Sequence, residues 1–573
     1  MSKYIDYKLI LTVIAVPIVL VVLFPSPYFD VSIDYEPDYF ANILSVLLNN
    51  HPVDITHPGL TVTYLSAIFV RIVGFFESQE SFILSLRFFF IFLNLTIIYL
   101  SMSVLNKNNT EHILLFFAIL VLYPAGHYYL DVLSPNIIIT SFGVLIAILG
   151  TKLNENKISY PLFYGLVLAL GVATKLTFIL VIIPVIFSMF VGFLKGEKGH
   201  FNVSFLIFLG SFICSSIIIF YPILPMIPLW PLVWPDVMVI IRGILNLLHE
   251  PYKALLYIAS LIVILFFILR KLRISLNNSK YEYKYESLYL TLSLICLSFL
   301  VIVPIIDIIR GKSYIEIVYW SGYFLPMLGF TVLFFRHNLS ILKLNITKYY
   351  VAIIFLLALS IKSYTNLINY RDSIIIDNKF NEDIQRLLED SNDVVFYPVS
   401  EFKSKDLFFA WSDYRYGDTK ALFSDKRESL PFSIDSKFER VHILNERNFF
   451  IPEGYFDDKV TYRYMKYLQE NDYTPNLHKS LLSKHLHRLD AKDICTQPYD
   501  GFSSARNFIV IFPKNFALIN SDATEDFSNP EINMSDKLMN AWVNKCNYKV
   551  DYSVGYFADI KSIFLKVTTE DDE

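Results

Sequence analysis

Apolar residues form long runs over the first two thirds of the chain, and short polar segments separate these runs. A membrane-spanning helix needs about 20 mostly apolar residues. The runs predict about eleven spans, at 9–24, 81–105, 112–126, 134–150, 158–173, 176–194, 202–222, 253–270, 287–309, 317–335 and 348–366. Pro25-Ser26-Pro27 follows the first run instead of a small-residue cleavage site, so we interpret that run as a retained span.

The pattern changes after the last predicted span, where short apolar runs alternate with polar segments. The runs 393–399 and 507–513 consist of β-branched and aromatic residues bounded by turn residues, which predicts strands. The spacing of apolar positions predicts helices at 381–388 and 461–468. This part of the chain is therefore predicted to be a mixed α/β domain.

Composition supports the same division. Charged residues make up 18% of the chain, against about 25% in average soluble proteins. Residues 1–370 hold 18 acidic and 23 basic residues, whereas residues 371–573 hold 35 and 26. The predicted fold is a polytopic α-helical membrane domain of about eleven transmembrane helices, 1–370, followed by a soluble domain, 371–573. No basic stripe suits a phosphate backbone, so no nucleic-acid partner is predicted.

The positions of Lys and Arg predict the orientation of the chain in the lipid bilayer. One set of connections is basic, and its members are Lys107, Lys152, Lys157, Lys195, Lys198, Arg270, Lys271, Arg273, Arg336, Lys343 and Lys348. By the positive-inside rule this set is cytoplasmic. The loop 28–80, the loop 223–252 and the C-terminal domain then lie outside the cytoplasmic membrane. Cys495 and Cys546 would form a disulfide there or remain two free thiols.

The first outer loop contains three carboxylates, Asp34, Glu36 and Asp38, with no cation nearby in the sequence. One interpretation is a catalytic carboxylate that accepts a proton from an attacking hydroxyl. If a divalent ion takes part, Asp38 and Glu36 offer the oxygen ligands that Mg²⁺ or Mn²⁺ prefers. The alternative is a solvated loop that merely follows the positive-inside rule.

A second candidate is His57, in the stretch Asp54-Ile-Thr-His57-Pro58-Gly59-Leu60. The apolar segment 61–76 that follows is short and contains Arg71, which favours a helix lying in the membrane interface. Pro58 suits the start of that helix. His57 would act as a proton shuttle or phosphate contact, or simply belong to the cap and turn.

These segments resemble the GT-C superfamily of glycosyltransferases, in the branch of the protein O-mannosyltransferases and the lipid A aminoarabinose transferase. The resemblance is carried by EPDYF followed by DITHPGLTVTYLSAIFVRI, by GLVLALGVATKLTFILVIIPVI (165–186), and more weakly by GYFLPMLGF (322–330). It covers most of residues 1–370. It rests on the order of the motifs, and residues 371–573 show no such likeness.

The resemblance implies inverting transfer of a sugar from a polyprenyl-phosphate donor at the outer membrane face. Asp38 and Glu36 would match the family's acidic pair, and Asp34 is a weaker candidate. Where the family often has Pro followed by an acid, this chain has Pro135-Asn136. Asn cannot act as a base, so either Asp131 takes that role or the second acidic site is absent. The sugar and the acceptor, whether lipid, glycan or protein, are not predicted.

Cations near the membrane provide candidate phosphate ligands. Lys175 interrupts an apolar stretch, and a charge in lipid costs several kcal/mol unless it has a partner. A lipid phosphate is one such partner; alternatively, Lys175 marks a turn between two short spans and reaches the headgroups. Arg242, Arg310 and Lys312 are further outer-face cations, each of which would also serve as an interface anchor.

Two other functions use the same class of lipid. A flippase or transporter of lipid-linked glycans would share the cations and an apolar groove but would not need outer carboxylates. An O-antigen ligase or polymerase would place its essential residues in a late, large outer loop. The early carboxylate cluster favours the glycosyltransferase interpretation over both.

Overall fold

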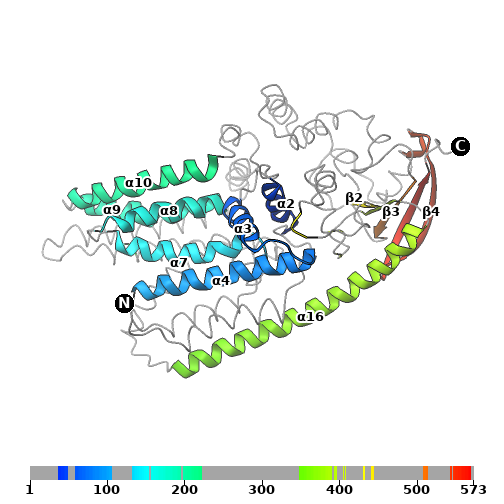
Figure 1. The fold of residues 1–573 in the computed structure, drawn as a ribbon, viewed down its shortest axis with the longest axis horizontal. Coiled ribbons are helices and arrows are strands. Elements are labelled where there is room, and N and C mark those ends of the chain that lie inside the picture. Colours follow the sequence, from blue (N-terminus) through cyan, green and yellow to red (C-terminus); the bar gives the residue numbers. More distant parts are fainter. Residues whose placement is uncertain are drawn as a thin grey trace, which may run out of the picture. The chain divides into compact units, whose positions relative to one another are not determined.

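The structure is a computed structural model. It describes residues 36–48, 59–105, 132–153, 157–194, 198–221, 289, 348–389, 393–396, 404, 407, 430–432, 440–443, 507–513, 542–544 and 546–568. The described helices, in chain order, are α2 (Glu36–Leu47), α3 (Leu60–Val73), α4 (Gln79–Leu105), α7 (Asn136–Lys152), α8 (Ser159–Thr174), the 3₁₀ helix η2 (Leu176–Ile182), α9 (Ile183–Leu194), α10 (Lys198–Phe220) and α16 (Lys348–Glu389) (Figure 1).

The chain divides into two compact units. The first unit comprises residues 1–26, 56–66 and 84–365, and the second comprises 27–55, 67–83 and 366–573. The second unit therefore combines much of the predicted first outer loop with the predicted C-terminal domain. The divisions fall within α3, α4 and α16, so that each of these helices contributes residues to both units.

The predicted fold class of about eleven transmembrane helices is wrong. In the part of the chain that the structure describes, two helical stretches are long and apolar enough to cross a membrane, Gln79–Ser101 and Val203–Phe220. They support an association with a membrane. The predicted spans that fall outside the described residues, Tyr289 excepted, are 9–24, 112–126, 253–270, 287–309 and 317–335.

Helix length explains why apolar runs overestimated the number of spans. α7 and α8 contain 17 and 16 residues. At 1.5 Å per residue they extend about 25 Å, less than the ~30 Å hydrocarbon core of a bilayer. The predicted span 176–194 is not one helix, because η2 precedes α9. Many apolar side chains of α7 and α8 are buried against protein, as Ile137 and Leu168 are. An apolar run therefore marks burial, which protein or lipid can provide.

In the first unit, α8 and α10 pack closely because glycine leaves room between them. A Cβ at Gly165 would overlap the backbone oxygen of Phe208. The rings of Tyr164 and Phe208 meet edge to face at 5.7 Å between centroids. Across the same contact the hydroxyl of Ser211 donates a 2.7 Å hydrogen bond to the carbonyl of Leu162. Small residues and hydroxyl hydrogen bonds are typical of helices that pack in an apolar environment.

A buried polar contact joins α4 to the start of α7. The side-chain amide of Asn94 donates to the carbonyl of Ile137, and the Ser141 hydroxyl donates to Asn94 Oδ1 at 2.6 Å. Asn94 and Ser141 are both buried. Because an unpaired buried polar group is costly, these hydrogen bonds fix how α4 and α7 align.

The second unit contains a five-stranded mixed sheet of order β2-β1-β3-β5-β4. Its strands are β1 (Asp393–Phe396), β2 (Val441–Ile443), β3 (Phe508–Pro513), β4 (Lys549–Phe557) and β5 (Ile560–Thr568). β1 runs parallel to β2 and β3, whereas β5 runs antiparallel to β3 and β4. The predicted strands 393–399 and 507–513 correspond to β1 and β3. The predicted helix 381–388 forms the end of α16, and 461–468 lies outside the described residues.

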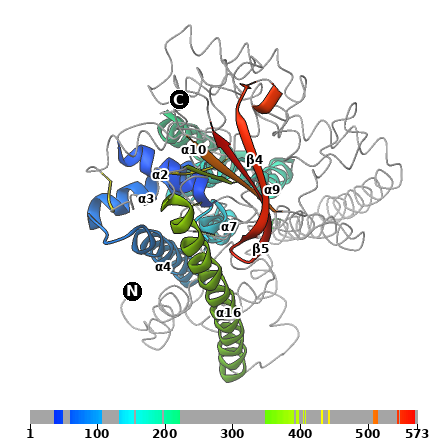
Figure 2. The same ribbon diagram turned by 90° about the vertical axis from the view of Figure 1, so that its right-hand side faces the viewer.

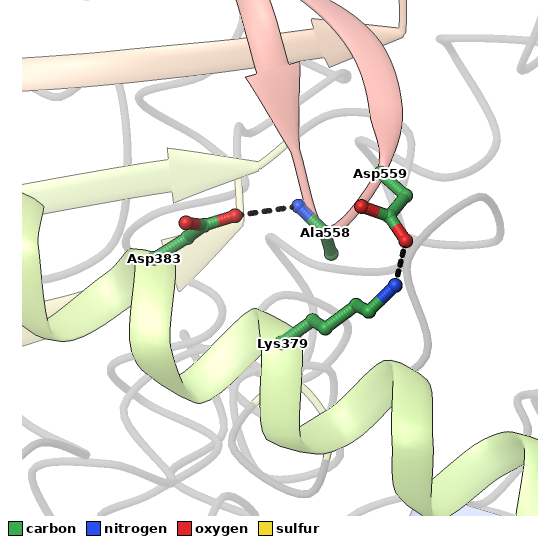
Figure 3. Close-up of polar contacts among 4 residues, drawn as sticks. All are labelled: Lys379, Asp383, Ala558 and Asp559. Atoms are coloured by element: carbon green, nitrogen blue, oxygen red, sulfur yellow. Dashed lines mark hydrogen bonds and ion pairs between the residues drawn. The ribbon is translucent and has the colours of Figure 1, made fainter.

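The C-terminal part of α16 packs on one face of this sheet. Figure 2 shows α16 together with β4 and β5. Phe380 on α16 contacts Phe396 on β1 and Phe557 on β4, with ring centroids 5.0 Å apart in each pair. Polar contacts extend this packing to the turn between β4 and β5 (Figure 3). There the carboxylate of Asp383 accepts a hydrogen bond from the backbone N–H of Ala558, and Lys379 forms an ion pair with Asp559.

Candidate functional site

The acidic candidates belong to a helix that the sequence analysis did not predict. Glu36 is the first residue of α2 and Asp38 the third, with Pro37 between them. Acidic residues and proline are both common in the first turn of a helix. There the backbone N–H groups have no partner within the helix, and the helix dipole has its positive end. Asp34 lies outside the described residues. The spacing of Phe40, Ile43, Leu44 and Leu47 is the signal that would have revealed this helix.

α2 is held by packing from Tyr39 onwards. Residues Tyr39 to Val46 are all buried. The ring of Phe40 contacts Phe82 of α4 at 5.6 Å and Phe432 at 5.8 Å between centroids. At the other end of the helix, Arg71 Nη2 of α3 donates a 3.4 Å hydrogen bond to the carbonyl of Val46. A basic side chain at this end also interacts favourably with the negative end of the helix dipole. The first turn with its two carboxylates is thus the end of a well-anchored helix.

The helix predicted after His57 is present. α3 begins at Leu60, directly after Gly59, which has a φ of +41° that suits glycine best. Gly59 accepts the backbone N–H of Thr63 and so opens the first turn. His57 itself lies outside the described residues. Ile68 and Ile72 leave an apolar strip of α3 exposed, as an interfacial helix would require.

Lys175 lies in the turn between α8 and η2. It has an extended backbone, with φ −150° and ψ 118°, and its N–H bonds to the carbonyl of Gly171. The backbone N–H of Phe178 donates a hydrogen bond to the carbonyl of Lys175. The ring of Phe178 leaves no room for a Cβ on Gly171. The position in a turn matches the alternative interpretation of Lys175. It is equally compatible with a phosphate ligand, because the side chain remains partly exposed.

Two helix starts lie at the same end of the first unit as Lys175. Thr61 of α3 and Thr174 of α8 both donate 2.7 Å hydrogen bonds to the carbonyl of Leu170. α7 packs beside α8 and η2, and the short link 153–158 joins its far end to the start of α8. The first residue of α7, Asn136, is therefore at the Lys175 end. Helix starts carry a partial positive charge of about half a unit, whereas the end of α8, which Lys175 caps, carries a partial negative charge of similar size. Two helix starts and the Lys175 cation against one helix end leave this end favourable for an anion.

Asp131, Arg242, Arg310 and Lys312 lie outside the described residues.

Metal binding receives no support from the described part of the chain. It holds no group of three or more His, Cys, Asp and Glu side chains that could bind a metal ion.

Sequence reasoning missed a polar contact between the first loop and α16. Tyr370 donates a 2.7 Å hydrogen bond to Glu80 Oε1, 290 residues away in the chain. The pKa of the Tyr370 phenol is raised above its usual value. Burial is the largest cause, and the hydrogen bond to Glu80 is the next. No local pattern predicts this pair, because the two segments are joined only by the fold.

A cluster of ionisable side chains around the buried carboxylate of Asp393 was also missed. His442 Nε2 of β2 lies 3.3 Å from Asp393 Oδ2, and Arg440 Nε lies 3.7 Å from Asp393 Oδ1. Arg440 also donates to the carbonyl of Leu388 at the end of α16. Because a buried carboxylate must be paired, we interpret this cluster as structural.

No protein-family model matches the chain, and no curated protein does. The likeness to the GT-C glycosyltransferases therefore rests on the motifs quoted above.

Proposed function

We propose that the protein is a glycosyltransferase that moves a sugar from a polyprenyl-phosphate donor to an acceptor hydroxyl at the outer face of the cytoplasmic membrane. The observation that carries the proposal is the pair of acidic residues in the first turn of α2, followed by the helix start after His57-Pro58-Gly59. The proposal depends on these motifs and not on the number of spans.

In the proposed reaction, Asp38 accepts the proton of the acceptor hydroxyl, and Glu36 supports it. The acceptor oxygen forms a bond to the anomeric carbon while the bond from that carbon to the phosphate oxygen breaks. The phosphate leaves as an anion, so no acid needs to protonate it, unlike in glycoside hydrolysis.

In the proposed reaction, Lys175 or Arg310 stabilises the negative charge that develops on the departing phosphate. A cation and two helix starts stabilise a developing negative charge without reorganising as the reaction proceeds. His57, which precedes α3, and the outer-face cations Arg242, Arg310 and Lys312 are further candidate contacts to the donor.

The covalent state of Cys546 supports an extracytoplasmic C-terminal domain. Cys546 is disulfide-bonded, whereas Cys214 is free. Disulfides persist mainly in oxidising compartments. Cys495 lies outside the described residues. Apolar side chains left exposed on α10, such as Leu206, Ile217 and Ile218, support contact with lipid.

The test is donor consumption by the purified full-length protein with a panel of polyprenyl-phosphate sugars, followed by thin-layer chromatography. Asp38→Asn is nearly isosteric and should lower turnover at least about 100-fold, since a positioned general base contributes about 10²–10⁴-fold. Donor affinity should stay the same. If Asp38→Asn, Glu36→Gln and Asp34→Asn all retain wild-type turnover, the catalytic assignment of this segment fails and a flippase becomes the better account.

A further inference from the structure

Four phenylalanines join the start of the chain to the C-terminal domain within the second unit. We call this set the aromatic clamp: Phe40 on α2, Phe76 between α3 and α4, Phe82 on α4, and Phe432 in the C-terminal domain. Phe432 lies 5.1 Å from Phe82 and 5.8 Å from Phe40 between ring centroids. Phe82 also meets Phe76 edge to face at 5.2 Å. All four side chains are buried.

Two hydrogen bonds accompany the aromatic clamp and join early residues to late residues of the second unit. The backbone N–H of Phe76 donates a 2.7 Å bond to the carbonyl of Pro431. The hydroxyl of Tyr370 on α16 reaches Glu80, two residues before Phe82. The aromatic contacts are therefore part of a built interface and not an isolated ring contact.

We propose that Phe432 is a positioning residue for α2. Its contact with Phe40 fixes the position of the first turn of α2, which contains Glu36 and Asp38. The inference rests on the proposed function, because it gives those carboxylates a reaction to serve. It implies that the C-terminal domain completes the transferase by holding this helix.

The geometry makes α2 dependent on this contact. Phe40 follows Asp38 by two residues, or about 3 Å along the helix axis. A helix of 12 residues is marginal without packing. Residues 39–46 are buried by neighbouring residues, and Phe432 is one of these neighbours through its contact with Phe40. A misplacement of about 1 Å in a catalytic group can cost about 100-fold in rate, so loss of the clamp should reduce turnover before it affects donor binding.

The experiment compares two buried phenylalanines of the second unit in the full-length protein. Phe432→Ala removes the clamp ring, and Phe396→Ala removes a ring of similar burial from the contact between α16 and the sheet. Hydrogen exchange is measured on peptides covering residues 36–47. Turnover and donor affinity are measured on the same samples, with Phe432→Leu as the conservative variant.

We expect Phe432→Ala to speed exchange in α2 about tenfold or more, because loss of packing favours local opening. Turnover should fall with unchanged donor affinity, and Phe432→Leu should recover part of both. Phe396→Ala should leave α2 exchange within about twofold of wild type. The inference is overturned if Phe432→Ala leaves α2 protected, or if Phe396→Ala exposes it equally. A wild-type protein that transfers no sugar would instead sink the proposed function, while the exchange result still decides the clamp.

Discussion

The carboxylate of Asp383 on α16 accepts a 2.8 Å hydrogen bond from the backbone N–H of Ala558, at the turn between β4 and β5. Ala558 and Asp559 both have positive φ, 46° and 64°, as the central residues of a type I′ turn do. Such a turn favours Asn and Gly over Ala. The Asp383 contact therefore holds a turn whose own sequence is not ideal for its shape.

Asp383→Ala should destabilise the β4–β5 hairpin by about 1–3 kcal/mol, because the largely buried Ala558 N–H loses its acceptor. Hydrogen exchange of peptides within 549–568 measures this as a change in opening free energy. The control is Asp559→Asn, which removes the ion pair with Lys379 at a site where both side chains are well exposed. Exposed pairs contribute at most about 1 kcal/mol, so a control effect as large as that of Asp383→Ala would contradict the assignment.

Tyr370→Phe should weaken the link between α16 and the start of α4 by about 1 kcal/mol, the net value of a typical hydrogen bond. The effect should depend on pH. The folded state raises the pKa of Tyr370, so its contribution is complete below the unfolded pKa of about 10 and is lost as pH rises further. The phenylalanine variant should therefore lose less stability than wild type above that pH.

Thermal unfolding of the full-length protein at pH 8 to 11, pH values chosen around the ordinary tyrosine pKa of about 10, measures this difference. Tyr364→Phe on the same helix is the control, because Tyr364 is exposed. Identical alkaline unfolding of wild type and Tyr370→Phe would contradict the prediction.

Lys175→Met should weaken donor binding about 10- to 100-fold, because hydrogen bonds to charged groups contribute about 1.5–3 kcal/mol. The loss should appear in donor affinity more than in turnover, the reverse of Asp38→Asn. Lys157→Met is the matched control, since Lys157 is exposed in the link at the opposite end of α8. Equal effects of the two substitutions would show that Lys175 acts through general charge and not as a ligand.

Gly165→Ala should destabilise the packing of α8 against α10. The new Cβ would overlap Phe208 O and lie 2.7 Å from the backbone nitrogen of Phe212. Overpacking of this kind typically costs about 1–3 kcal/mol. Gly210→Ala on α10 is the opposite case, because nothing lies within 4 Å of the added carbon. It should be neutral or stabilise the helix by up to about 1 kcal/mol. Thermal unfolding in detergent compares them, and equal melting temperatures would refute the close contact.

The candidate site was partly predictable. The helix after His57 and the special place of Lys175 follow from local features, namely Pro-Gly before an apolar run and a lone charge within one. α2 was not predicted, although its apolar spacing indicates a helix. Its contacts with Phe82 and Phe432 could not have been predicted, because a ring contact between distant segments leaves no periodic trace in the sequence.

The sequence by itself determined where most described helices and strands β1 and β3 form, because hydrophobic periodicity and turn residues act over a few neighbouring positions. It also placed a change in composition near residue 370. Tertiary structure alone decided which apolar runs are buried by protein and which residues pair across the chain. Tyr370 and Glu80 are an example of such a pair. The reason is physical: an apolar side chain gains the same free energy on leaving water for either environment, so the run alone does not specify its partner.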